Sequence, residues 1–272
     1  SRDWSSDVCS SDLQTLQRVA EVFFNKSSSD STDFTNTLEE EIAPLLSAHQ
    51  DAIRLDPALY RRLQSLHERR HELGLDAEGV YLIERYYTEF TLAGAGLDDD
   101  QKEQLRDDNK RLSTLTTRFE KNLLADTNEL AVVFDTADDL AGLGDGEISA
   151  AAEAARERGL AGKYVVTLVL PTGHPWLASL TNRRSRERIM AASRSRGIHG
   201  GEHDNRELVL EITRLRARRA RLLGFETHAA FVTADETAKT PQAVADMLGR
   251  LAPPAARNAR AEEADLQRQL GD

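Results

Sequence analysis

The sequence is nearly free of cysteine and has no long apolar run. Cys9 is the only cysteine among 272 residues. A single thiol can form neither an internal disulfide framework nor a cysteine zinc site, and this composition is typical of a reducing compartment. No stretch approaches the roughly 20 apolar residues that a membrane-spanning helix needs. We therefore expect a cytoplasmic protein without a membrane partner.

Residues 1–13, "SRDWSSDVCSSDL", are unlike the rest of the chain. A common short-read sequencing adapter, translated in one frame, encodes Trp4–Leu13. We interpret residues 1–13 as a non-native scar and exclude them, Cys9 included, from the fold prediction. At the other end, "LQRQLGD" stops inside a helical pattern. We therefore expect residues 14–272 to be a helical domain that is truncated on both sides.

The chain also lacks an excess of positive charge and the usual phosphate-binding and nucleophile motifs. Its formal net charge is −11, which disfavours binding to a nucleic-acid backbone. The basic run "RLRARRARLL", Arg214–Leu223, has no interleaved aromatic residues. It predicts a solvated helix face paired with carboxylates. No Gly-rich phosphate loop and no G-x-S-x-G motif occurs.

The dominant pattern in the chain is helical periodicity, most clearly in Asp98–Asp126, where apolar residues recur three, four or seven positions apart. Pro57 fits the first helical position after Asp56, and Gly74 fits a stop signal. The fold class we predict is mainly α, an antiparallel helical scaffold with short connections. The predicted helices are Leu13–Phe24, Phe34–Ile53, Pro57–Leu73, Glu78–Leu92, Asp98–Asp126, Glu147–Arg158, Asn182–Ser195, Asn205–Leu223 and Pro241–Gln269.

Two segments interrupt this periodicity with β-branched residues, "LAVVF" (Leu130–Phe134) and "YVVTLVL" (Tyr164–Leu170). The following "PTGHP" predicts a turn. Together they predict a small β-hairpin inserted into the helical domain.

The most specific chemical pattern is His67-Glu68-Arg69-Arg70-His71, which satisfies the H-E-x-x-H motif of zinc peptidases. On a helix, histidines at i and i+4 lie one turn apart on one face, and the glutamate acts as general base on a metal-bound water. A third ligand could come from Glu84 or Glu89, although nothing distinguishes either from other surface carboxylates.

Three observations argue against a zinc site at this motif. The histidines flank the apolar stripe of a packing helix. Arg69 and Arg70 would place two positive charges beside a dication. The predicted helix also stops at Gly74, soon after His71. The structural interpretation is therefore preferred, and a small independent zinc peptidase that uses His67, Glu68 and His71 remains the alternative.

A second stretch, His199-Gly200-Gly201-Glu202-His203, matches the inverted H-x-x-E-H motif. The motif needs a helix, but two adjacent glycines cost about 2 kcal/mol in one. We predict a loop that ends in a helix N-cap near Asp204.

Four strings resemble a known family in their order and spacing: "FTLAGAGL" (Phe90–Leu97), "EISAAAEAARERGL" (Glu147–Leu160), "ARLLGFETHAAF" (Ala220–Phe231) and "AKTPQAVADML" (Ala238–Leu248). They are similar to the N-terminal part of the thimet-oligopeptidase-like zinc metallopeptidases, in the peptidyl-dipeptidase (dipeptidyl carboxypeptidase) branch. The resemblance extends from about Leu16 to the end of the chain.

This resemblance implies a helical, neurolysin-like N-terminal part of a hydrolase that releases C-terminal dipeptides from oligopeptides. The family's H-E-F-G-H zinc helix, glutamate ligand and substrate-binding tyrosines lie in a downstream catalytic part, which would be this chain's main partner. "LHERRHELGL" matches a region where relatives have no zinc ligands. We therefore assign no catalytic, metal-binding or substrate-binding residue and expect an inactive chain that binds no zinc. A non-catalytic helical binding module derived from the same scaffold is the alternative.

Overall fold

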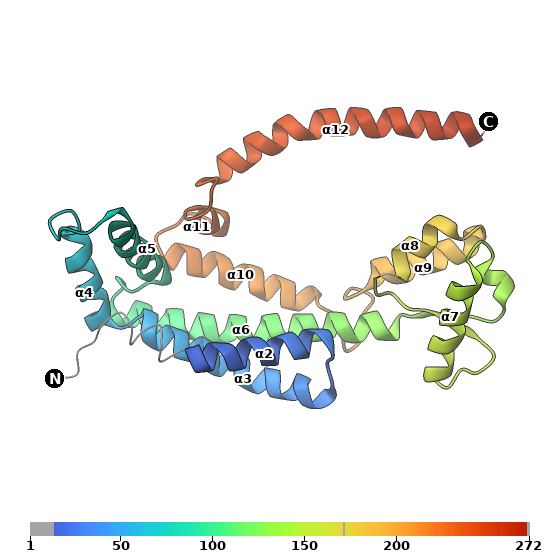
Figure 1. Ribbon diagram of the computed structural model, residues 1–272, viewed down its shortest axis with the longest axis horizontal. Coiled ribbons are helices and arrows are strands. Elements are labelled where there is room, and N and C mark those ends of the chain that lie inside the picture. The colour runs from blue at the N-terminus through green and yellow to red at the C-terminus, as the bar shows by residue number, and fades with distance from the viewer. Residues whose placement is uncertain (1–13, 171, 271–272) are drawn as a thin grey trace. The chain divides into compact units, whose positions relative to one another are not determined.

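The computed structural model describes residues 14–170 and 172–270, and most of these residues are helical (Figure 1). The interpretation of residues 1–13 as a scar falls outside the described residues. The mainly α prediction is confirmed. The elements are α2 (Gln14–Ser29), α3 (Asp33–Arg54), α4 (Pro57–Glu68), α5 (Ala77–Ala93), α6 (Asp99–Glu129), β1 (Val132–Phe134), a 3₁₀ helix η1 (Ala137–Leu140), α7 (Asp145–Glu157), β2 (Tyr164–Val166), α8 (Gly173–Ser179), α9 (Arg183–Ser195), α10 (Arg206–Leu222), α11 (His228–Thr233) and α12 (Pro241–Leu270).

Local capping explains where several helices begin. Asp56 accepts a hydrogen bond from the Leu59 amide at 2.7 Å, and Pro57 takes the first helical position, as predicted. Asn182 caps α9 through its side-chain oxygen. These side chains satisfy amides that a helix leaves without an internal partner.

The described residues form two compact units, residues 14–47 with 110–212 and residues 48–109 with 213–270. The first unit contains a small α/β core. β1 and β2 pair antiparallel, with Val132 opposite Val166 and Phe134 opposite Tyr164. The rest of this buried core comes from η1, α7, α8 and α9 and the segments between them, and its apolar members are Val132, Phe134, Leu140, Leu143, Ala151, Val166, Leu168, Trp176, Leu180 and Ile189. This confirms the inserted β element, although η1 and α7 lie in the connection between its strands.

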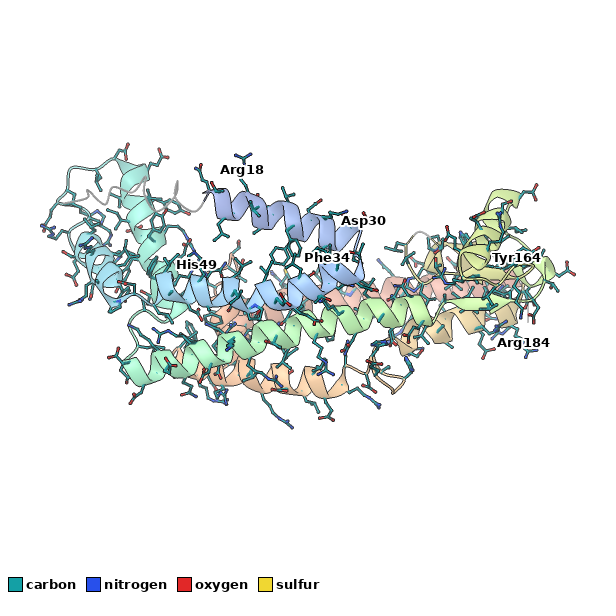
Figure 2. The ribbon with its side chains drawn as sticks, turned by 90° about the horizontal axis from the view of Figure 1, so that it is seen from below. Arg18, Asp30, Phe34, His49, Tyr164 and Arg184 are labelled. Atoms are coloured by element: carbon teal, nitrogen blue, oxygen red, sulfur yellow. The ribbon has the colours of Figure 1, made fainter. Side chains whose placement is uncertain are left out.

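The α2–α3 hairpin belongs mainly to the same unit. Figure 2 labels Asp30 just beyond the end of α2 and Phe34 at the start of α3, on either side of the bend. Ser27 is buried and donates a hydrogen bond to Glu39 at 2.5 Å, and Lys121 of α6 pairs with Glu40 at 3.0 Å. The second unit contains the α4–α5 pair. In it, Gly94 ends α5 in the left-handed region, at φ +100°.

Most predicted helices agree with the structure to within a few residues, but three predictions were wrong in detail. α4 ends at Glu68 rather than Leu73. The second strand covers only Tyr164–Val166 of the predicted Tyr164–Leu170. "PTGHP" is not simply a turn, because α8 begins at Gly173. The short helices α8 and α11 were not predicted, since segments of six or seven residues show too little periodicity.

Candidate functional site

The H-E-x-x-H motif does not form one continuous helical face. His67 lies in the last turn of α4, whereas Arg69 is the C-cap and His71 lies in the turn that follows. Since the i, i+4 ligand geometry requires helical backbone throughout, the two imidazoles do not form the pair that this motif uses to hold zinc.

The groups considered as zinc ligands around His67 already contact other side chains. The His67 ring stacks on Tyr87, with centroids 4.1 Å apart and planes inclined by 16°. Arg70 donates one hydrogen bond to the His67 carbonyl and another to Glu84, each at 2.7 Å. Glu89 pairs with Arg85 at 3.1 Å. The two carboxylates considered as a third ligand are thus both held by arginines.

The inverted motif lies in a loop, as predicted. Gly200 and Gly201 have φ of +90° and +88°, in the left-handed region that favours glycine. At the end of this loop, Asp204 accepts a hydrogen bond from the Arg206 amide at 2.9 Å. Hydrogen bonds from the Arg206 side chain and amide hold the pKa of Asp204 down at about 2.

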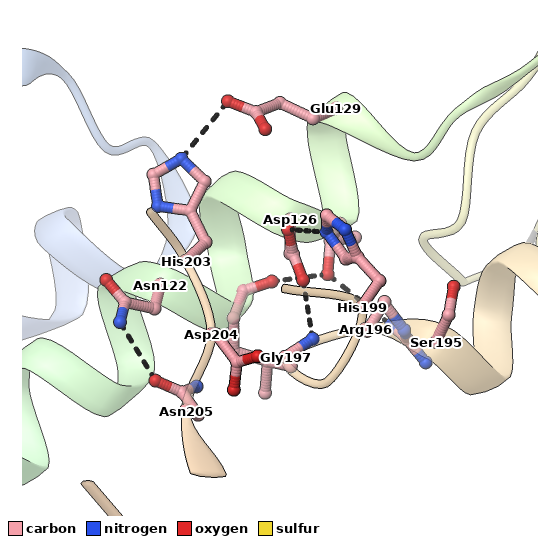
Figure 3. A network of polar contacts seen from close by, with 12 residues as sticks. Asn122, Asp126, Glu129, Ser195, Arg196, Gly197, His199, His203, Asp204 and Asn205 are labelled. Carbon is pink, nitrogen blue, oxygen red and sulfur yellow. Dashed lines mark hydrogen bonds and ion pairs between the residues drawn. The ribbon is translucent and has the colours of Figure 1, made fainter. Parts of the chain in front are cut away.

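The two histidines of this loop contact α6 at separate carboxylates (Figure 3). The Nε2 atom of His199 lies 2.7 Å from an Asp126 oxygen, and that of His203 lies 3.1 Å from a Glu129 oxygen. Asp126 is completely buried and also accepts a hydrogen bond from the Gly197 amide at 2.5 Å. The histidines therefore fasten the loop to α6.

A pair of buried amides extends this network. The Asn122 side chain donates to the Asn205 side chain at 2.9 Å (Figure 3). Asn205 in turn donates to the Phe119 carbonyl at 3.0 Å. Buried polar groups stabilise a fold only when they are satisfied in this way. The network fixes the start of α10 against the C-terminal half of α6.

Neither histidine motif therefore has the geometry of a zinc site. Among residues 14–170 and 172–270, no group of three or more His, Cys, Asp or Glu side chains is arranged to hold a metal ion. Our assignment of no metal-binding or catalytic residue stays a prediction, which metal analysis can test.

The arginines of the basic run on α10 are exposed, except for Arg219. Arg218 donates to the buried Asp108 at 2.9 Å, which agrees with the predicted carboxylate pairing. Arg219 differs, because it lies half-buried with its guanidinium 5.5 Å from the Phe231 ring centroid. Burial, followed by the charge of Arg216, lowers the pKa of Arg219. The run is thus partly a packing surface.

The sequence-based search did not find Asp126, which organises the polar network. Asp126 is one carboxylate among the many on α6, and its partner His199 lies 73 positions away. The only available signal was a charged residue close to the apolar stripe of α6.

Within the described residues, no helix is long and apolar enough to cross a membrane.

Known proteins similar to this chain are peptidases. Residues 176–272 match the sequence profile of Peptidase family M3. The chain is 38% identical to a dipeptidyl carboxypeptidase of Salmonella typhimurium and 35% identical to one of Escherichia coli, in each case over 93% of this chain and 37% of the relative. It is 31% identical to oligopeptidase A of Haemophilus influenzae over 77% of this chain and 31% of that protein. The chain thus spans only about a third of the length of these relatives.

Proposed function

Since the chain belongs to peptidase family M3, we propose that residues 14–272 form the helical N-terminal part of a zinc peptidyl-dipeptidase. The complete enzyme would release C-terminal dipeptides from oligopeptides in the cytoplasm. The observation that carries this proposal is the 38% identity to a dipeptidyl carboxypeptidase over 93% of the chain.

In the proposed enzyme, the catalytic zinc would be held by residues outside the part described here. There it would activate a water molecule for attack on the peptide carbonyl. The helices described here would build one wall of the substrate cleft and limit access to short peptides. The mainly helical fold supports this role. The engagement of His67, Glu84 and Glu89 in stacking and ion pairs supports the separate proposal that this part of the enzyme holds no zinc.

A dipeptide-release assay tests the proposal. The chain alone, with added Zn²⁺, should release no dipeptide from an N-blocked oligopeptide, and metal analysis should find no stoichiometric zinc. A chimera in which residues 14–272 replace the matched region of the Salmonella enzyme should release C-terminal dipeptides. Zinc-dependent hydrolysis by the chain alone, abolished by His67→Ala, would overturn the assignment.

Peptide-length selectivity tests the role as a cleft wall. Deleting the matched region from the Salmonella enzyme should widen the range of peptide lengths that are cleaved, if the shortened enzyme folds. A less disruptive test neutralises single surface charges of residues 14–272 in the chimera and measures the same length selectivity. Unchanged length selectivity in every variant would rule out a role in access.

A further inference from the structure

A groove in the first unit combines an apolar floor with two arginines, of which Arg196 is the one without an ion pair among the described residues. It has a volume of about 440 Å³ and lies between α6, the loop after α9 and the start of α10. Phe119 and Leu123 contribute from α6, and Ile198 and Leu210 line it from the loop and from α10. Ile198 and Leu210 are 54% and 46% exposed, so the groove is open to solvent.

The charge without an ion pair is that of Arg196, which lines the same groove. Its guanidinium donates to the Ser193 carbonyl at 3.1 Å and lies 3.4 Å from the hydroxyls of Ser193 and Thr127. All of these acceptors are neutral. Within the part of the chain that the structure describes, no carboxylate lies within ion-pair distance of Arg196.

The other charges at the groove are already compensated. Arg206 is paired with Asp204. The nearby Asp126 carboxylate is buried and accepts from the Gly197 amide and contacts the His199 ring. Asn205, which is buried beneath the groove, uses its amide group for Asn122 and Phe119. Arg196 is therefore the cation available to a ligand.

We propose that this groove binds a polypeptide segment in which an aliphatic side chain adjoins an acidic one. The aliphatic group would lie on Phe119, Leu123 and Leu210, and the carboxylate would form a bidentate pair with Arg196. An arginine that faces only neutral acceptors beside an exposed apolar surface favours this combination over a purely apolar occupant. The inference does not depend on the proposed peptidase function.

Two peptides that differ by one functional group test the proposal: acetyl-Asp-Leu-amide and its neutral counterpart acetyl-Asn-Leu-amide. Each is titrated into the ¹⁵N-labelled chain to about 20 mM, since single-anchor contacts are millimolar. The acidic peptide should shift the amide signals of Gly197, Ile198 and Leu210. It should bind about fivefold more tightly than the neutral one.

Three variants test whether Arg196 causes the difference in affinity between the two peptides. Arg196→Gln should bind both peptides equally weakly, Arg196→Lys should retain the preference, and Arg194→Gln, an exposed position of α9, should behave like the parent. Equal binding of the two peptides by the parent, or shifts confined to other surfaces, would overturn the proposal. So would groove signals that change with protein concentration alone, because a second copy would then be the occupant.

Discussion

At the scale of single residues, Asp126 is the most constrained polar group of the first unit. It is fully buried, and its two oxygens meet the Gly197 amide and the His199 ring. Asp126→Asn would replace the carboxylate by a neutral amide and so lose the charge-assisted hydrogen bonds of this buried group. We expect the free energy of unfolding in urea to fall by about 2–3 kcal/mol.

Glu129→Gln is the matched control for Asp126→Asn. Glu129 also contacts a loop histidine, but its side chain is 62% exposed. Water replaces the lost interaction there, so we expect little change in unfolding free energy. If the two variants were equally stable, the buried network would not be what fastens the loop to α6.

His228 should make the unfolding free energy of the second unit fall as the pH is lowered. Burial, followed by the charges of Arg216 and Arg219, lowers the pKa of His228 below its ordinary value of 6.5. The unfolded chain therefore binds this proton at a higher pH than the folded chain does. The stability that the neutral ring contributes is present above about pH 6.5 and is lost as the pH falls towards the lowered pKa.

His228→Gln should remove this contribution. We expect the variant to lose less unfolding free energy than the parent when the pH is lowered from about 7.5 to 5.5, as measured by urea denaturation at each pH. The other histidines are common to both proteins, so their effects cancel in the comparison. Identical pH profiles would show that His228 titrates as it does in the unfolded chain.

Residue-level prediction from sequence succeeded where a local property decided the outcome. The glycine pair Gly200-Gly201 correctly predicted a loop, and Asp56-Pro57 correctly predicted a helix start. Residue-level prediction failed where a partner distant in sequence decided the outcome. Nothing near His199 indicates that its ring contacts Asp126, because that contact depends on how the helices pack.

At the scale of elements, α4 shows why a helix end is hard to predict. Gly74 is a reasonable stop signal, yet the helix ends at Glu68. Arg70 donates to the His67 carbonyl and pairs with Glu84 of α5, so a contact between two helices stabilises the early end. Periodicity within α4 holds no information about this contact.

The turn after η1 depends on Gly142, at φ +99°. A Cβ atom at this position would lie 2.2 Å from the Ser179 carbonyl oxygen and 2.9 Å from the Thr181 nitrogen. The close approach lets the Ala141 carbonyl accept a hydrogen bond from the Thr181 amide at 2.8 Å. We expect Gly142→Ala to lower the unfolding free energy by at least about 3 kcal/mol, because backbone would have to move.

The variant Gly162→Ala distinguishes the energetic cost of steric crowding from the cost of the left-handed backbone conformation alone. Gly162 has φ +84°, but no heavy atom lies within 4 Å of its added Cβ. The left-handed conformation alone should cost about 1 kcal/mol in a urea titration. If both alanine variants lost the same unfolding free energy, the contact with Ser179 would not account for the loss in Gly142→Ala.

At the scale of the whole molecule, the sequence predicted the class of fold but not the division into two units. Amphipathic periodicity is a property of each helix, so it predicted α3, α6, α10 and α12 nearly at their observed bounds. The units combine segments from distant parts of the chain, residues 14–47 with 110–212 in one of them. That pairing depends on long-range packing, which a single sequence does not encode locally.

The helix α12 leaves a row of large apolar side chains in water. Met247, Leu248, Leu251, Leu266 and Leu270 are 45% to 82% exposed. Exposed apolar surface of this kind promotes association, because burying it removes apolar area from water. We expect size-exclusion chromatography with light scattering to show a mass that rises with protein concentration.

Replacing Leu248 and Leu251 together by lysine should weaken this association at least about tenfold, since each change removes apolar area and adds charge. Arg250→Lys combined with Arg257→Lys keeps both the charge and the apolar row of α12 and should associate like the parent. A parent that stayed monomeric at every concentration would show that the exposed row does not drive association. If the lysine and control variants associated equally, another surface would be responsible, and the groove beside Arg196 would be the next one to test.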